Sequence, residues 1–132
     1  MAELQNKGAE QYVIGAMLSN PTCIDIVAGI VSPEQFTDSA YRDLFYLIQH
    51  CSAKGMAVDV VTLSTVRPVL SNGDSTIACA AEVHAQSGGS SNVEACAQII
   101  AEKSKLRLCL ATVKNLENRI KTEDTDSESL IA

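Results

Sequence analysis

Apolar side chains recur at intervals of three and four residues along most of this chain, which is the spacing of one face of an α-helix. The pattern is longest from Asn92 to Lys121, a stretch without proline or glycine. The apolar positions of this repeat are Cys96, Ile99, Leu106, Leu110, Val113 and Ile120. Lys103 and Glu117 occupy its two remaining positions. Asn92 is a favourable N-cap. The pattern predicts one long helix whose far end projects beyond the core of the chain and contacts a partner.

Five shorter segments with the same periodicity precede the long one. They predict helices over about 10–19, 21–31, 39–53, 60–70 and 76–86, after a polar lead-in at 1–9. Asn20, Asp38 or Ser39, and Asp59 are the expected N-caps, and Pro68 should kink the fourth helix or end it early. The side chains expected to face the core are Val13, Ile14, Met17, Leu18, Ile24, Val27, Ile30, Val31, Phe36, Tyr41, Leu44, Phe45, Ile48, Cys51, Val60, Leu63, Val66, Leu70, Ile77, Ala81 and Val83.

The periodicity also divides the chain. Residues 10–90 are predicted to form a globular helical bundle, in which the helix with most of the aromatic residues is central. Gly88–Ser91 is interpreted as a flexible link to the long helix at 91–121. After Lys121, Thr125 and Glu128 have the spacing of a capping box, which predicts that 122–132 begins a further helix. The predicted fold class is therefore all-α: a compact bundle of about five short helices followed by one long helix.

Composition narrows the class of function. The chain has 132 residues, 46% of them hydrophobic and 4% aromatic, so one aliphatic core is expected. A net charge of −6 argues against a protein that mainly binds phosphate backbones. Six of the ten basic residues nevertheless lie on the long helix. They either solvate its outer face or form a contact surface for an acidic partner, for which the candidates are Lys105, Arg107, Lys114 and Arg119. Direct nucleic-acid binding ranks third, because no aromatic residues interleave with them.

The residue types that carry chemistry do not form a recognisable set. The sequence has no G-x-x-x-x-G-K-[ST] motif, so no ATP site of that kind is expected, and no catalytic, cofactor-binding or metal-binding residues are predicted. The five cysteines are widely spaced, as in buried positions of a cytoplasmic protein. His50 and Cys51 are neighbours that point about 100° apart on a helix, and Asp59 is explained by capping. Neither a signal peptide nor a membrane-spanning run of ~20 apolar residues is present.

Taken in order, four passages resemble the N-terminal domain of DnaB-family replicative DNA helicases of bacteria and phages. They are Ala9–Leu18, Pro33–Phe45, Gly55–Leu63 and Ser91–Arg107. In the second passage the similarity lies in Pro33-Glu34-Gln35-Phe36 and in Tyr41-Arg42-Asp43-Leu44-Phe45. Residues 73–78 depart from the family by lacking a tyrosine, and Pro68 interrupts a helix that the family keeps regular.

The resemblance implies an all-α bundle followed by a helical hairpin, with 91–121 as its first arm and 122–132 as the truncated start of its second. Hairpins of this family pair subunits into a collar of three dimers, which sits on a ring of ATPase domains and recruits primase. The chain would then be a non-catalytic collar domain with other helicase subunits, primase and a helicase loader as partners. ATP and magnesium would belong to an ATPase domain outside this chain. The expected self-association stripe is Leu106, Leu110, Val113, Leu116 and Ile120.

Two alternatives remain open at this stage. A stand-alone adaptor or inhibitor that mimics the helicase collar would have the same sequence features, and the length of the native reading frame separates the two. A thiol or metal enzyme built on Cys51 and the histidines is the other. Because the second arm is truncated, the chain is expected to be a monomer or a weak, concentration-dependent dimer.

Overall fold

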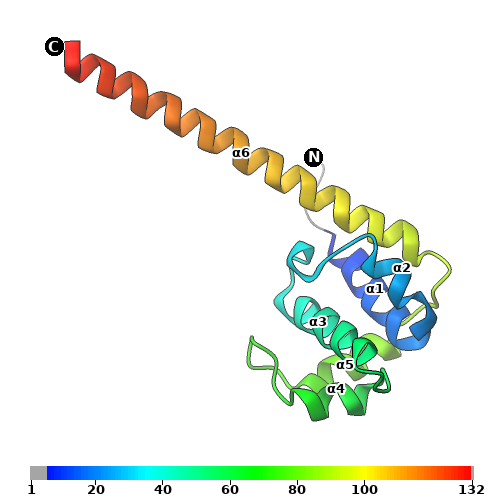
Figure 1. Cartoon of the computed structure of the whole chain (residues 1–132). Coiled ribbons are helices and arrows are strands. Elements are labelled where there is room, and N and C mark those ends of the chain that lie inside the picture. Colours follow the sequence, from blue (N-terminus) through cyan, green and yellow to red (C-terminus); the bar gives the residue numbers. More distant parts are fainter. Residues whose placement is uncertain (1–5, 132) are drawn as a thin grey trace.

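The computed structural model describes the backbone of residues 6–131 and the side chains of residues 6–122. Short helices pack into a globule at one end of a single long helix (Figure 1). The elements are α1 Lys7–Ser19, η1 Pro21–Cys23, α2 Ile24–Ala28, η2 Pro33–Gln35, α3 Ser39–Ala53, α4 Val60–Val66, α5 Thr76–Ala85 and α6 Val93–Ile131. The prediction of an all-α fold is confirmed; in the described part of the chain the β-type pairing is one isolated bridge between Val69 and Ser75.

Helix N-caps set most of these boundaries. The Asp38 carboxylate accepts hydrogen bonds from the backbone N–H groups of Ala40 and Tyr41, at 2.9 and 3.2 Å. Asp59 caps α4 by accepting from the N–H of Thr62 at 2.7 Å. This hydrogen bond holds the pKa of the Asp59 carboxyl below its ordinary value, so the cap stays ionised to lower pH. Both predicted caps are confirmed.

The first helix begins earlier than predicted. The Asn6 side chain accepts from the N–H of Ala9 at 2.9 Å, so α1 starts at Lys7. Ala9 is buried, and the prediction of a polar lead-in is wrong for residues 7–9. The predicted lead-in at residues 1–5 lies outside the described part of the chain. The sign of this earlier start in the sequence was Asn6, because asparagine is favoured at the N-cap position.

Pro68 ends α4 early, as predicted. Arg67 is extended, because the residue before a proline avoids the helical region. Val66 was expected to face the core, but it lies in the last turn of the helix and is exposed. Leu63 and Leu70 are buried as expected.

The fifth helix turns a different face inward from the one predicted. Val83 is buried as predicted, together with Thr76 and Ala80, whereas Ile77 and Ala81, which were also predicted to face inward, are exposed. The physical reason is close approach to α1: a Cβ added at Gly15 would lie 3.2 Å from the carbonyl oxygen of Val83. With Val83 fixed there, Thr76 and Ala80 lie on the same helix face, seven and three residues earlier, whereas Ile77 and Ala81 point more than about 100° away from it.

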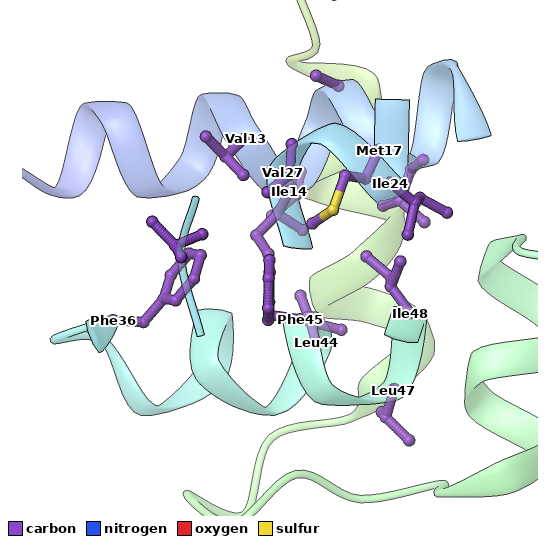
Figure 2. Packing of buried hydrophobic residues seen from close by; sticks show 14 of the residues in the cluster. Val13, Ile14, Met17, Ile24, Val27, Phe36, Leu44, Phe45, Leu47 and Ile48 are labelled. Carbon is purple, nitrogen blue, oxygen red and sulfur yellow. The ribbon is translucent and has the colours of Figure 1, made fainter. Parts of the chain in front are cut away.

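The core lies mainly between α1 and α3, and Phe36 closes one end of it (Figure 2). The rings of Phe36 and Phe45 are in contact, with centroids 4.8 Å apart. The prediction that α3 is the centre of the globule is wrong, because α1 packs against α3, α5 and α6 and is the more central helix. The labelled core residues in Figure 2 are Val13, Ile14, Met17, Ile24, Val27, Phe36, Leu44, Phe45, Leu47 and Ile48.

A buried carboxylate joins α1 to the start of α3. Glu10 is 1% exposed. One oxygen of its carboxylate accepts from the N–H groups of Thr37 and Asp38, at 3.0 and 3.1 Å, and the other accepts from the Thr37 hydroxyl at 2.7 Å. Buried charges are tolerated when they are hydrogen-bonded in this way. Periodicity places Glu10 at a helix start, and nothing in the pattern marks it as buried.

The long helix continues past its predicted end. The backbone is helical without a break from Val93 to Ile131, so the prediction that a new helix starts in 122–132 is wrong for the described backbone. No proline or glycine occurs in this range, and every residue can therefore continue the helix. The side chains of Thr125 and Glu128, which suggested the capping box, lie outside the described residues.

All five cysteines are free thiols. Cys23 and Cys51 are buried, and Cys79 and Cys96 are partly buried, as expected. Cys109 is exposed, so the prediction of burial is wrong for this residue. Desolvation raises the pKa of the thiols of Cys23, Cys51, Cys79 and Cys96.

Replacing the buried carboxylate tests its structural role. Glu10→Gln removes the charge and replaces one accepting oxygen with an amide NH₂ group, which then faces another hydrogen-bond donor. We therefore expect the free energy of unfolding to fall by about 1–3 kcal/mol. Urea denaturation followed by circular dichroism measures it. Glu82→Gln, the same change at an exposed position of α5, should stay within about 0.5 kcal/mol of the parent chain. Equal effects of the two changes would contradict this role for Glu10.

Thiol labelling tests the environment of the cysteines. A raised pKa leaves less thiolate at about pH 8, and the thiolate is the reacting form. Ellman's reagent should therefore modify Cys109 first and the other four at least about tenfold more slowly, with rates that rise as the pH increases. Cys109→Ser should remove the fast phase. A fast phase that survives this substitution would reveal an activated cysteine and favour a thiol enzyme.

Candidate functional site

The long helix α6 has a covered part and an uncovered part. Val93, Ala97 and Ile100 are buried against the globule, and from Leu108 to Thr122 every residue is exposed. A helix of 39 residues is about 58 Å long. Figure 1 shows the greater part of this length extending away from the globule. Among the described residues, this uncovered part of α6 is the candidate functional surface, because its side chains are not needed to pack the globule.

The direction of α6 is set by contacts between α1 and the segment before the long helix. The backbone N–H of Asn92 donates to the Tyr12 hydroxyl at 3.1 Å. Ser90 accepts from the side-chain amide of Asn20 at 3.1 Å, and the hydroxyl of Ser19 donates to that of Ser87 at 2.8 Å. The segment predicted as a flexible link is therefore held on α1. The serine side chains account for the difference, because they supply the hydrogen bonds.

Arg107 connects α6 to the globule just before the exposed part of the helix begins. Its guanidinium donates to the carbonyl oxygen of Gln35 at 2.9 Å, and the side chain is partly buried. The neighbouring carbonyl, that of Phe36, accepts from Arg42 at 3.0 Å. Arg107 was expected to face a partner. That prediction needs correction, because Arg107 satisfies a carbonyl of η2 and anchors α6 to its own chain.

The predicted self-association stripe lies on the uncovered part. Its side chains are between 42% and 57% exposed, and they fall within an arc of about 120° around the helix axis. Large aliphatic side chains at this exposure, gathered on one face, are typical of protein-interaction surfaces. The stripe consists of Leu106, Leu110, Val113, Leu116 and Ile120.

The stripe and the globule lie on roughly opposite sides of α6. At about 100° per residue, the buried residues Val93, Ala97 and Ile100 point almost directly away from the stripe. The pattern through Cys96 and Ile99, which are partly buried, did not predict this buried face. The spacing of Val93, Ala97 and Ile100 was the available signal. A partner could therefore approach the stripe without meeting the globule.

Basic side chains border the stripe. Lys105 and Arg119 lie along one edge and Lys114 along the other, and all three are exposed. Residues 93–122 carry six basic and three acidic side chains, whereas residues 6–92 carry four basic and eight acidic ones. The exposed half of α6 is thus an apolar surface with a positive border, attached to an acidic globule.

Two of the residues weighed as enzymatic candidates, His50 and Cys51, pack against other side chains of the globule. The ring of His50 stacks on Tyr46 at a centroid distance of 6.3 Å, while Cys51 is buried in the core. His84 and Asp59 line a shallow cavity of about 240 Å³ with Leu18, Val60 and Val61. Within residues 6–122 no three His, Cys, Asp or Glu side chains are grouped so that they could hold a metal ion. None of the described helices combines the length and hydropathy needed to cross a membrane.

Known helicases are similar to this chain over nearly its full length. It is 25% identical to the replicative DNA helicase DnaC of Bacillus subtilis (strain 168) over 97% of the chain. It is 26% identical to the replicative DNA helicase DnaB of Geobacillus stearothermophilus over 96% of the chain. The chain spans 29% and 28% of the length of these two relatives.

Solved structures with this fold come from the same group. The N-terminal domain of DnaB helicase from Mycobacterium tuberculosis superposes with a TM-score of 0.75 at 25% identity, covering 88% of this chain and 86% of that one. A DnaB-like replicative helicase, studied for its interactions with primase, superposes with a TM-score of 0.72 at 19% identity. This superposition covers 89% of the present chain and 28% of the helicase chain. The family described as DnaB-like helicase N terminal domain matches residues 2–102, and the chain therefore belongs to this family.

Proposed function

We propose that this domain joins the subunits of a replicative DNA helicase through α6 and serves as a docking site for primase. The observation that carries the proposal is the exposed apolar stripe on the half of α6 that the globule does not cover. Family membership supports a place in a helicase, and the stripe supports a role in holding subunits together. The ATPase activity, with ATP and magnesium, would belong to a part of the protein outside these residues.

The size of the stripe indicates how strong the association should be. Fully burying a large aliphatic side chain contributes roughly 1.5–3 kcal/mol, so covering the exposed half of each contributes about 1 kcal/mol. Five residues from each of two copies then contribute about 10 kcal/mol, against an association cost of roughly 4–15 kcal/mol. The free energy gained by burial and the free-energy cost of association therefore nearly cancel. The stripe alone therefore supports a weak, concentration-dependent dimer.

Two observations support primase as a further partner. A structural neighbour with the same fold was solved in a study of its interactions with primase. In addition, the positive border of α6 offers a complementary surface to an acidic partner. Lys105, Lys114 and Arg119 are the residues proposed to face that partner. A helicase loader is a third proposed partner, which rests on the family resemblance.

Substituting the middle of the stripe tests subunit association. Leu110→Asp places a charge where a second helix would pack, so we expect the dimer dissociation constant to rise at least about tenfold while helicity changes little. Sedimentation equilibrium and circular dichroism give the two measurements. Leu108→Asp is the matched control, because Leu108 is 69% exposed and points away from the stripe.

The control should leave the dissociation constant within about twofold of the parent value. Unfolding by Leu110→Asp would show that Leu110 belongs to the core of the chain. Equal dissociation constants for the parent chain and both variants would place the interface elsewhere. A chain that stays monomeric at all concentrations would contradict subunit association through α6.

Charge reversal at the border of the stripe tests primase docking. Lys105→Glu combined with Arg119→Glu should weaken binding of purified primase, encoded in the same genome, about tenfold in a titration calorimeter. Raising the salt concentration should reduce the difference, since exposed charges are screened. Lys54→Glu, an exposed lysine of the globule, serves as the control. Equal binding by both variants would contradict docking on this border.

A further inference from the structure

A second apolar surface lies on the globule, in the segment that contains α4 and the start of α5. Five of the seven large apolar side chains that are exposed within residues 6–92 belong to this segment, which makes it the most apolar part of the globule's surface. They are Met56, Val61, Val66, Val69 and Ile77. Exposed apolar side chains gathered in one region are typical of a binding surface.

This surface is hollowed at one end. The end of α1, the start of α4 and the end of α5 meet around a cavity of about 240 Å³, whose lining residues are Leu18, Asp59, Val60, Val61 and His84. Leu18 is buried and Val60 is partly buried, whereas Val61 is 65% exposed. The cavity therefore has an apolar floor, with a carboxylate and an imidazole at its rim.

The apolar surface continues from the cavity along α5. Ile77 lies seven residues before His84, so the two side chains share a helix face, and Ala81 lies between them. All three residues are exposed. The line from His84 to Ile77 is about 10 Å long. An amphipathic helix that binds in a groove spans the same length with its anchors at i, i+3 or i+4, and i+7.

The charge of this region is negative. Residues 55–92 carry three acidic side chains and one basic side chain, Arg67. The guanidinium of Arg67 lies 3.9 Å from the carboxylate of Asp43, which offsets its charge. The hydrogen bond from the N–H of Thr62 holds the pKa of the Asp59 carboxyl below its ordinary value, so the rim of the cavity is anionic at neutral pH. The complementary ligand has apolar side chains next to lysine or arginine.

We propose that the surface between α4 and α5 is a docking site for a basic amphipathic helix of a partner protein, which places an apolar side chain in the cavity and a cation beside Asp59. Figure 1 shows α4 and α5 on the side of the globule away from the free part of α6. A partner bound there leaves the stripe and its basic border open. The proposal is therefore independent of subunit association, and its partner is opposite in charge to the acidic partner proposed for α6.

A synthetic peptide tests the site in the whole chain. The probe is a fluorescein-labelled helix of leucine and lysine with about 18 residues, which is long enough to be helical in water, and its binding is followed by fluorescence anisotropy. Val61→Lys places a cation at the apolar rim, so the dissociation constant should rise at least about tenfold. Asp59→Asn removes the charge and keeps a favourable N-cap, and it should raise the dissociation constant about threefold.

Matched changes on α2 separate this site from general attraction to an acidic globule. Ile26→Lys and Asp25→Asn alter exposed residues outside the cavity, and each should leave the dissociation constant within about twofold of the parent value. Leu110→Asp should also leave peptide binding unchanged. A leucine–glutamate peptide of the same pattern should not be weakened by Val61→Lys.

The outcomes distinguish this site from the other possible occupants and surfaces. Failure of the parent chain to bind the leucine–lysine peptide would overturn the proposal, as would equal binding by the parent chain, Val61→Lys and Asp59→Asn. Equal losses in the α2 controls would show general charge attraction only. Loss of peptide binding in Leu110→Asp would place the peptide on α6.

Sedimentation equilibrium of Val61→Lys separates a partner protein from a second copy of this chain. Self-association should be unchanged, and weaker self-association would show that a second copy occupies the surface, which would overturn the proposal. Circular dichroism should show the parent helicity in Val61→Lys, and Asp59→Asn tests the site by a change that leaves Val61 in place. A chain that stays monomeric but binds the peptide through Val61 would support this proposal and contradict subunit association.

Discussion

The packing of the first three turns of α6 on α1 determines what the rest of the molecule presents to solvent. Val93, Ala97 and Ile100 are buried there, and the N–H of Asn92 is held by the Tyr12 hydroxyl. With this end fixed, residues 108–122 of the helix are left exposed, because the described globule does not cover them. The exposed stripe is thus a consequence of where α6 is anchored, and it faces away from the anchoring surface.

The anchoring of α6 leaves an apolar stripe exposed, while polar side chains of the globule have structural roles. The chemically versatile side chains of the globule are used for folding: Glu10 joins α1 to α3, Asp38 and Asp59 cap helices, and Cys51 fills the core. The result is a globule that directs a long helix into solvent. Arg107 completes it by bonding to η2 at the point where the helix leaves the globule.

Sequence periodicity predicted the fold class, most helix positions and the exposed stripe, because a 3.6-residue repeat directly reports which side chains share a face. It failed where packing chose between faces of similar hydrophobicity. On α5, the close approach between Gly15 and Val83 turned the face of Ala80 inward and that of Ile77 toward solvent. On α6, Val93, Ala97 and Ile100 formed the buried face, although the predicted pattern ran through Cys96 and Ile99. The roles of Glu10 and Arg107 depend on backbone groups far away in the sequence, and no local pattern reports these.

Hydrogen exchange of the α6 backbone at two protein concentrations tests the central claim most directly. The account predicts that the amides of residues 106–120 exchange rapidly in dilute solution and become protected as the concentration rises, while those of α1 and α3 keep the same protection. Protection of residues 106–120 that is equally high at both concentrations would show that the chain covers this part of α6 itself. Concentration-dependent protection confined to the globule would place the interface on another surface.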